Sequence, residues 1–64
     1  MGIIRRANYL FLTWKGDHSP QHVHVYKDSR FILKWDLENG RAMRGRSTRR
    51  VLRLIRELRE EGSL

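Results

Sequence analysis

The chain has 64 residues, of which 14 are lysine or arginine and 7 are aspartate or glutamate, so its formal net charge is +7. A chain of this length builds one domain, residues 1–64, with a small core that a dimer contact, a bound metal or a partner protein commonly supplements. Because it contains no cysteine, disulfide bonds and the commonest structural zinc sites are excluded.

The basic residues are mostly arginine, and the isoelectric point is about 11.1. This is the electrostatic footprint of a nucleic-acid binder, so we expect nucleic acid, RNA rather than DNA, as the leading partner. An acidic protein partner, or a basic surface that serves only solubility, is the alternative. The apolar run that ends at Trp14 is too short to span a membrane and no cleavage site follows it, which predicts a soluble cytoplasmic protein.

Three strands are predicted in the first half of the chain, over residues 7–14, 22–27 and 30–37. In each strand two sets of side chains alternate between the two faces. The sets of the first strand are Tyr9, Phe11 and Thr13 against Leu10, Leu12 and Trp14. Those of the second are Val23 and Val25 against His22, His24 and Tyr26, and those of the third are Phe31, Leu33, Trp35 and Leu37 against Ile32, Lys34 and Asp36. Proline at position 20 lengthens the loop between the first two strands.

The turn after Lys27 decides which face of the sheet the histidines occupy, since a slip of one residue moves every side chain to the other face. A turn with an odd number of residues places Val23 and Val25 in one core with Phe31, Leu33 and Trp35. A strict two-residue turn at Asp28-Ser29 instead places the histidines beside Leu33. The apolar pattern favours the first arrangement.

The second half of the chain predicts a hairpin and a helix. Asn39-Gly40 is typical of a two-residue type I′ turn, which leads into a short strand over residues 41–44. A helical period follows over residues 48–61, with Ser47 as N-cap and Gly62 as the residue after the C-cap. Its apolar stripe consists of Val51, Leu54, Ile55 and Leu58. The predicted fold class is α+β: an antiparallel meander of three to four strands with one C-terminal helix packed on one face.

The histidines are the strongest chemical signal, because all three lie between positions 18 and 24. His22 and His24 are two apart on a strand, so both rings project from one face. With His18 they could hold a divalent metal such as zinc, nickel, iron or manganese, to which Asp17 or Asp36 would add an oxygen ligand. Alternatively, His22 and His24 with Asp36 form an acid–base set for phosphodiester cleavage. A structural role in fixing the loop is the third interpretation.

Arginines gather at the start of the predicted helix and glutamates at its end, the reverse of what the helix dipole favours. Arginines beside a helix N-terminus suit phosphate binding, and a solvated basic surface is the alternative. The residues predicted to contact nucleic acid are Arg46, Arg49, Arg50, Arg53, Lys34 and Tyr26.

The sheet face away from the helix is a further candidate surface. It is expected to expose Tyr9, Phe11, His22, His24, Tyr26 and Ile32 beside Lys34. Aromatic rings interleaved with basic residues suit the stacking of RNA bases, and they suit a dimer or partner interface equally well.

The stretch Asp17-His18-Ser19-Pro20-Gln21-His22-Val23-His24-Val25 resembles the signature His-x-Pro-Pro-His-x-His-Val of domain-of-unknown-function family 4160, with Gln21 in place of the second proline. Asp36, Gly40, Gly45 and the pair Arg49-Arg50 also stand where similar members place theirs. The resemblance implies a small bacterial protein encoded beside another small protein, in a manner that suggests a toxin–antitoxin module.

Three functions follow as hypotheses. The first is an RNA-binding component of a toxin–antitoxin-like pair. The second is a small ribonuclease-type toxin that depends on its histidines, with or without a metal. The third is a protein-interaction module, homodimeric or paired with another small protein, in which the histidines are structural.

Overall fold

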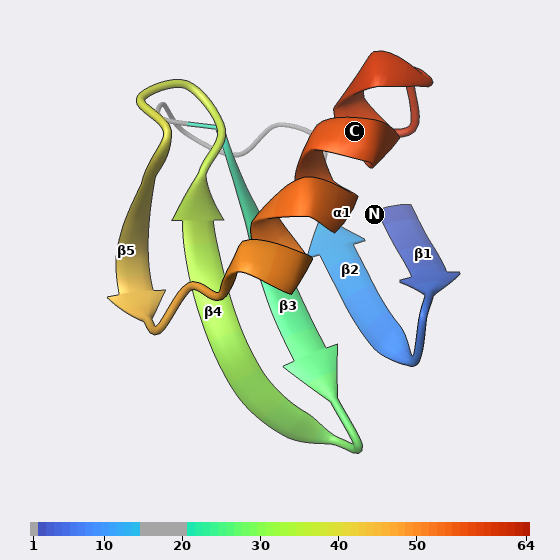
Figure 1. Ribbon diagram of the computed structural model, residues 1–64, viewed down its shortest axis with the longest axis vertical. Helices are drawn as coiled ribbons and strands as arrows, with labels where there is room; N and C mark the ends of the chain where they lie inside the picture. Colours follow the sequence, from blue (N-terminus) through green and yellow to red (C-terminus); the bar gives the residue numbers. More distant parts are fainter. Residues whose placement is uncertain (1, 15–20) are drawn as a thin grey trace.

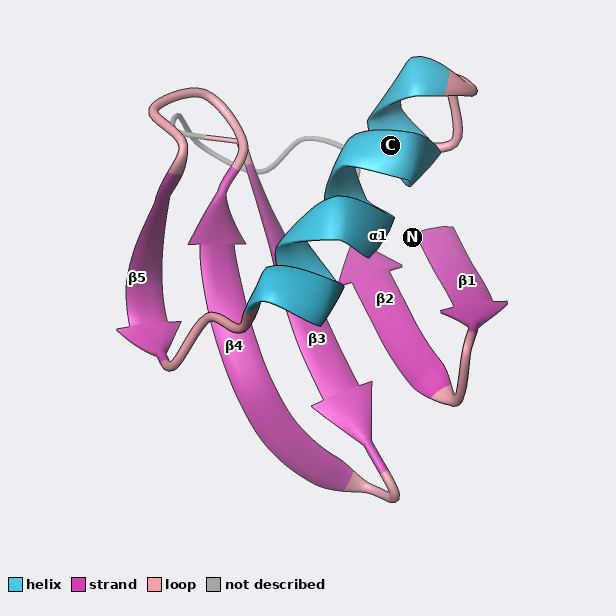
Figure 2. Cartoon of the chain, in the orientation of Figure 1, coloured by secondary structure: helices cyan, strands magenta, loops and turns pink. Residues whose placement is uncertain are grey.

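The computed structural model describes residues 2–14 and 21–64, which form one antiparallel sheet and one helix (Figure 1). The sheet has five strands in sequence order: β1 (Gly2–Arg6), β2 (Tyr9–Thr13), β3 (His22–Lys27), β4 (Arg30–Asp36) and β5 (Arg41–Gly45). The helix α1 (Arg49–Glu60) follows β5 and crosses one face of the sheet (Figure 2). The predicted α+β class with a C-terminal helix is therefore confirmed, whereas the predicted count of three to four strands is wrong.

The additional strand is β1, which joins β2 through a two-residue turn. Ala7 and Asn8 have positive φ, 50° and 68°, and Arg6 pairs with Tyr9. A type I′ turn requires positive φ at both central residues, which asparagine tolerates and alanine seldom adopts. Because an alanine occupies the first position of the turn, the sequence pattern did not indicate a turn there. The prediction of one strand over residues 7–14 is therefore wrong at its start.

The turn between β3 and β4 also has two residues. Asp28 and Ser29 have φ of 51° and 64°, and Lys27 pairs with Arg30. This is the turn that the sequence associated with histidines on the core side of the sheet. In the structure the histidines nevertheless lie on the face opposite the core, because the register changes further along the two strands.

One extra residue in β4 corrects the register. Tyr26 pairs with Phe31, but Val25 pairs with Leu33, so Ile32 has no partner of its own in β3. Such a β-bulge moves the rest of the strand by one residue. Val25 and Leu33 therefore share the core, as the apolar pattern favoured, while Phe31 lies on the opposite face with Tyr26. The prediction that Phe31 belongs to the core face is wrong.

The core lies between α1 and the sheet face that the helix covers. It consists of Tyr9, Phe11, Val23, Val25, Leu33, Val51, Leu54, Ile55 and Leu58. The apolar stripe predicted for the helix is thereby confirmed. Tyr9 and Phe11, expected on the uncovered face, are 9% and 0% exposed, because Phe11 pairs with Val25 and shares its face. Ile32, expected on the uncovered face too, packs against this core instead.

The two ends of α1 are capped by side-chain and backbone bonds. Thr48, one residue later than the predicted Ser47, is the N-cap, and its hydroxyl accepts the Val51 N–H at 3.2 Å. Gly62 has φ of 82°, and the N–H groups of Gly62 and Ser63 donate to carbonyls of the last turn at 3.1 and 2.8 Å.

No helix in the described part of the chain has the length and apolar character that a membrane crossing needs.

An ion pair ties β1 to the end of the helix. Both terminal nitrogens of Arg6 donate to the carboxylate of Glu61, each at 2.8 Å. The hydrogen bond from Arg6 is the main cause that lowers the pKa of Glu61 below its ordinary value, and the hydroxyl of Ser63 adds to it. The edge strand β1 is thus held to α1 as well as to β2.

The loop between β4 and β5 is longer than the sequence predicts. Asp36 pairs with Arg41, so residues 37–40 form the loop, and the Gly40 N–H donates to the Asp36 carbonyl at 2.9 Å. The prediction of a two-residue turn at Asn39-Gly40, with a third strand that extends to Leu37, is wrong. Gly40 does adopt the expected positive φ, at 67°.

Gly45 ends β5 where the chain passes very close to β4. A Cβ atom at this position would lie 2.3 Å from the carbonyl oxygen of Ile32, and φ is 82°. Gly62 has the same φ, but a Cβ atom there would meet no atom within 4 Å. A side chain at position 62 would therefore meet backbone strain alone, whereas a side chain at position 45 would meet the same strain and a steric clash.

We expect Gly45→Ala to destabilise the protein more than Gly62→Ala. Positive φ costs an alanine about 1–2 kcal/mol at either site. The clash with Ile32 should add about 1–3 kcal/mol at position 45 alone. Urea unfolding of both variants measures the difference, and equal losses would contradict the close approach of Gly45 to β4.

Candidate nucleic-acid interface

The sheet face that α1 leaves uncovered is the candidate site, and we call it the open face. Val23 and Val25 of β3 point into the core, so the alternation along the strand directs His22, His24 and Tyr26 to the open face. Among the described elements, only α1 packs on the sheet, and it lies on the other side (Figure 1). The prediction that the three β3 side chains lie opposite the core is confirmed.

Five aromatic rings contact one another across the open face, and we call them the ring cluster. Trp14 and His22 meet His24 nearly edge-on, with centroids 4.9 and 5.2 Å away. Phe31 lies 6.5 Å from His24 and 5.8 Å from Tyr26. Trp14 is 37% and Phe31 38% exposed, whereas Nδ1 of His24 is buried. His24 is therefore the centre of the cluster, and its outer rings offer free surface.

Cationic side chains border the ring cluster. Lys34 pairs with His24 across the two central strands, and Arg44 pairs with Lys34, which places both on the open face. The Arg44 guanidinium lies 5.6 Å from the centroid of Phe31, within the range of a cation–π contact. A base stacked on these rings would thus have its phosphates within reach of positive charge.

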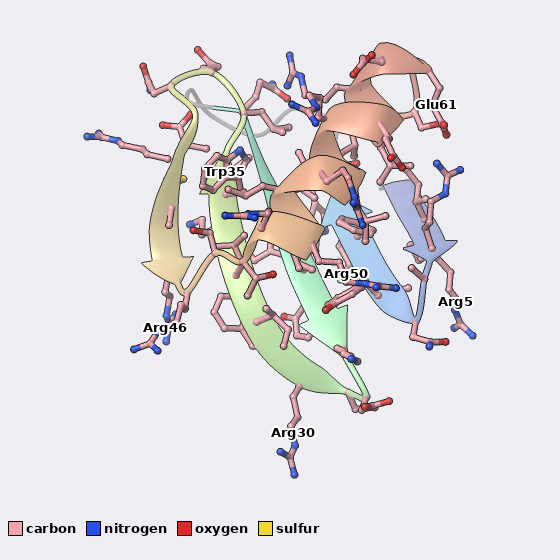
Figure 3. All side chains as sticks on the ribbon, viewed as in Figure 1. Arg5, Arg30, Trp35, Arg46, Arg50 and Glu61 are labelled. Carbon is pink, nitrogen blue, oxygen red and sulfur yellow. The ribbon has the colours of Figure 1, made fainter. Side chains whose placement is uncertain are left out.

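One end of the open face is hollow. A depression of about 350 Å³ lies between the β1–β2 and β3–β4 turns, and it is lined by Arg5, Asn8, Tyr9, Leu10, Tyr26, Asp28 and Ser29. Arg5 pairs with Leu10, which pairs with Tyr26, so the arginine and the tyrosine share the open face. Figure 3 shows Arg5 and Arg30 directed outward at this end of the molecule.

Asp36, predicted as a catalytic residue, pairs with His22 but has both carboxylate oxygens occupied. Oδ1 accepts the N–H groups of Glu38 and Asn39, each at 2.9 Å, and Oδ2 accepts Nδ2 of Asn39 at 2.7 Å. The hydrogen bond from the Asn39 side chain is the main cause that lowers the pKa of Asp36; burial opposes it, and the two backbone N–H groups and Arg41 reinforce it. The carboxylate therefore fixes the loop of residues 37–40.

The six residues predicted to contact nucleic acid do not form one surface. Lys34 and Tyr26 lie on the open face. The exposed arginines of α1 line the opposite side, where Arg49, Arg53 and Arg56 with Leu52 border a cleft of about 300 Å³. Figure 3 places Arg50 on α1 and Arg46 at the end of β5.

The predicted metal site falls partly outside the described residues, because His18 belongs to residues 15–20. In the described ranges, no group of three or more histidine, cysteine, aspartate or glutamate residues could hold a metal ion. His22 and His24 remain together on the open face, so the acid–base pair and the metal set stay predictions.

Three residues of the open face were missed in the sequence: Trp14, Phe31 and Arg44. Trp14 follows the predicted alternation, but β2 was assigned to the wrong face. Phe31 was grouped with Leu33 by the regular alternation, but the bulge at Ile32 places the two residues on opposite faces. Arg44 lies in a strand whose only predictive signal was the preceding turn, so nothing indicated that it faces Phe31.

Comparison with known protein families gives a match over most of the chain. The model of a family described as Domain of unknown function (DUF4160) matches residues 8–63. No curated protein and no solved structure matches the chain.

We expect Asp36→Asn to remove part of the protein's sensitivity to acid. Because the folded-state pKa of Asp36 lies below the unfolded one, its ionised form stabilises the fold above about pH 4, and this stabilisation is lost as pH falls further. The variant should be less stable than the wild type at pH 7, and the gap should close towards pH 2. Thermal unfolding between these values measures it.

The matched control for this experiment is Asp28→Asn. Asp28 is exposed and lies in a turn with positive φ, which asparagine tolerates. If Asp28→Asn reproduces the pH dependence of Asp36→Asn, the loop-fixing role of Asp36 is refuted.

Proposed function

The chain belongs to the DUF4160 family, and from this membership and the open face we propose that it is an RNA-binding protein that holds single-stranded RNA on its sheet. The family description states no activity, so the proposal depends on the open face. The observation that carries it is the ring cluster, with Lys34 and Arg44 beside it. As the family resemblance implies, the protein would act as one member of a toxin–antitoxin-like pair, and the sequence pattern favours the cytoplasm as its location.

Stacking on exposed rings supports a single-stranded ligand. Unpaired bases expose their flat faces, and each base stacked on an aromatic side chain contributes about 1–3 kcal/mol. Trp14 and Phe31 are the rings with the most exposed surface on this face. Small sheet-based RNA binders stack two or three bases in this way.

The charge distribution supports a phosphate ligand over a purely apolar partner. A protein interface usually excludes charge from its centre. Here Lys34 projects from the middle of the open face, and Arg44 lies against Phe31. The net charge of +7 would add attraction to RNA at long range.

Cleavage of RNA is the second candidate function, and the contact between two imidazole rings favours it. His22 and His24 lie with ring centroids 5.2 Å apart on the same face that would hold the RNA. Two histidines can divide the roles of general base and general acid between them. Nδ1 of His24 is buried, so this nitrogen could not take such a role towards an RNA on the open face.

We expect Phe31→Ala to weaken the binding of a fluorescent, single-stranded RNA by on the order of tenfold, because one stacking ring is lost. Arg44→Gln should weaken it as well, and it should reduce the slope of log affinity against log salt by about 0.7, the effect of one phosphate contact. Fluorescence anisotropy at several salt concentrations measures both quantities.

Arg53→Gln is the control for these variants. Arg53 is exposed on α1, and its substitution removes the same charge as Arg44→Gln. It should leave the affinity within about twofold. Equal losses for the two glutamine variants, or an affinity that does not change with salt, would refute binding on the open face.

The two candidate functions differ in the fate of the RNA. If the protein only binds, RNA incubated with it stays intact, and this is the result we expect. If it cleaves, the products should disappear in both His22→Asn and His24→Asn, and the rate should have a bell-shaped pH profile. Adding a chelator then distinguishes metal-dependent cleavage from acid–base catalysis by the histidines alone.

A further inference from the structure

The helix side of the sheet is only partly covered. α1 runs diagonally over the central strands and leaves the β5 side free (Figure 2). All five residues of β5 are exposed. A groove of about 410 Å³ follows this side of the helix, and it is lined by Trp35, Leu52, Ile55, Arg56, Arg59 and Glu60.

The uncovered strip beside α1 widens towards the C-terminal end of the helix, because α1 crosses the sheet diagonally and moves away from β5 (Figure 2). Five strands about 4.8 Å apart span about 19 Å, and a helix with its side chains covers about 10 Å, so one helix cannot cover the sheet. The groove lies on the β5 side of α1 and is lined by Arg56, Arg59 and Glu60 of its last turns. A helical segment that docks there would lie beside α1 and insert side chains into the groove.

The floor of the groove is apolar. Trp35 of β4 is half-buried, and Figure 3 shows it beside α1 on the side of β5. Its strand partner Ala42 lies on the same face and is exposed. Leu52 and Ile55 of α1 complete the floor. An occupant must therefore present apolar side chains of its own.

The rim of the groove is positively charged. Arg56 and Arg59 line it from α1, a helix with five arginines and two glutamates. The acidic residue of the rim, Glu60, has its Oε1 atom 3.9 Å from Nε of Arg56, so these two charges offset each other and the rim keeps the positive charge of Arg59. An occupant with acidic side chains next to its apolar ones would therefore match both the positive rim and the apolar floor.

We propose that this groove binds an amphipathic helical segment of a partner protein, apolar on one face and acidic on its flanks. A second copy of this chain fits poorly, because the two grooves would bring Arg56 and Arg59 against their counterparts, at +7 per chain. A nucleic acid is a poorer occupant, because Trp35 is half-buried and the rest of the apolar floor, Leu52 and Ile55, is aliphatic and offers no ring on which a base could stack. The groove and the open face lie on opposite sides of the sheet, so the partner and an RNA can bind together, and neither site depends on the other.

A designed peptide tests the proposal with the full chain. The probe is a fluorescent peptide of about 16 residues, long enough to form a helix, with leucine at positions i, i+3, i+4 and i+7 and glutamate on its flanks. We expect saturable binding in the micromolar range, measured by anisotropy. Amide shifts in NMR spectra should map to α1, β4 and β5 on the groove side.

Charge reversal locates the binding. Arg56→Glu combined with Arg59→Glu should weaken the glutamate peptide by at least about tenfold and should strengthen a peptide with lysine in place of glutamate. The control is Arg5→Glu combined with Arg30→Glu, which changes the net charge equally at the far end of the sheet (Figure 3). It should alter affinity by less than about threefold. Thermal unfolding establishes that all variants are folded.

Several results would overturn the proposal. These are a lack of saturable binding, equal binding of a peptide with the same composition in scrambled order, equal loss in both double variants, and amide shifts that map to the open face. A wild-type dimer in sedimentation that Arg56→Glu with Arg59→Glu dissociates would identify a second copy as the occupant instead.

Discussion

The arrangement of the whole molecule depends on one bulged residue, Ile32 of β4, which has no pairing partner in β3. The two-residue turn at Asp28 and Ser29 alone would place the histidines of β3 on the core side, where α1 packs. The bulge at Ile32 restores Val25 opposite Leu33. Phe31 lies between the turn and the bulge, so it keeps its pairing with Tyr26 and lies on the open face near His24, apart from Leu33. Both the dry core and the ring cluster therefore follow from the same local irregularity.

Much of the fold could be predicted from the sequence. The helical period, its apolar stripe and the glycine after its end were sufficient for α1, and the alternation in β3 was sufficient for the two faces of that strand. The features that escaped prediction are those in which one residue acts against its usual preference. Alanine with positive φ concealed the β1–β2 turn, and a bulge cannot be inferred from a pattern that reads equally well with regular pairing.

The candidate site was predicted less completely, and for a different physical reason. Residue type and spacing indicated that His22, His24 and Tyr26 share a face, since this needs only the geometry of one strand. Assembling them with Trp14, Phe31 and Arg44 requires the register of three further strands. That register depends on the face of β2, on the bulge at Ile32 and on the loop before β5. The arginines of α1 illustrate the same limit: they were grouped with Lys34 by charge, but the sheet separates them from it.

The ion pair between Arg6 and Glu61 has a consequence for the order of events in synthesis. The two residues are 55 positions apart, so the ribosome adds Glu61 about 3–11 s after Arg6 at the usual speed of elongation. During this interval β1 can pair with β2 but has no helix to hold it. A nascent chain in which β1 and β2 have paired would thus keep both faces of this hairpin uncovered by the helix until the last turn of α1 is made.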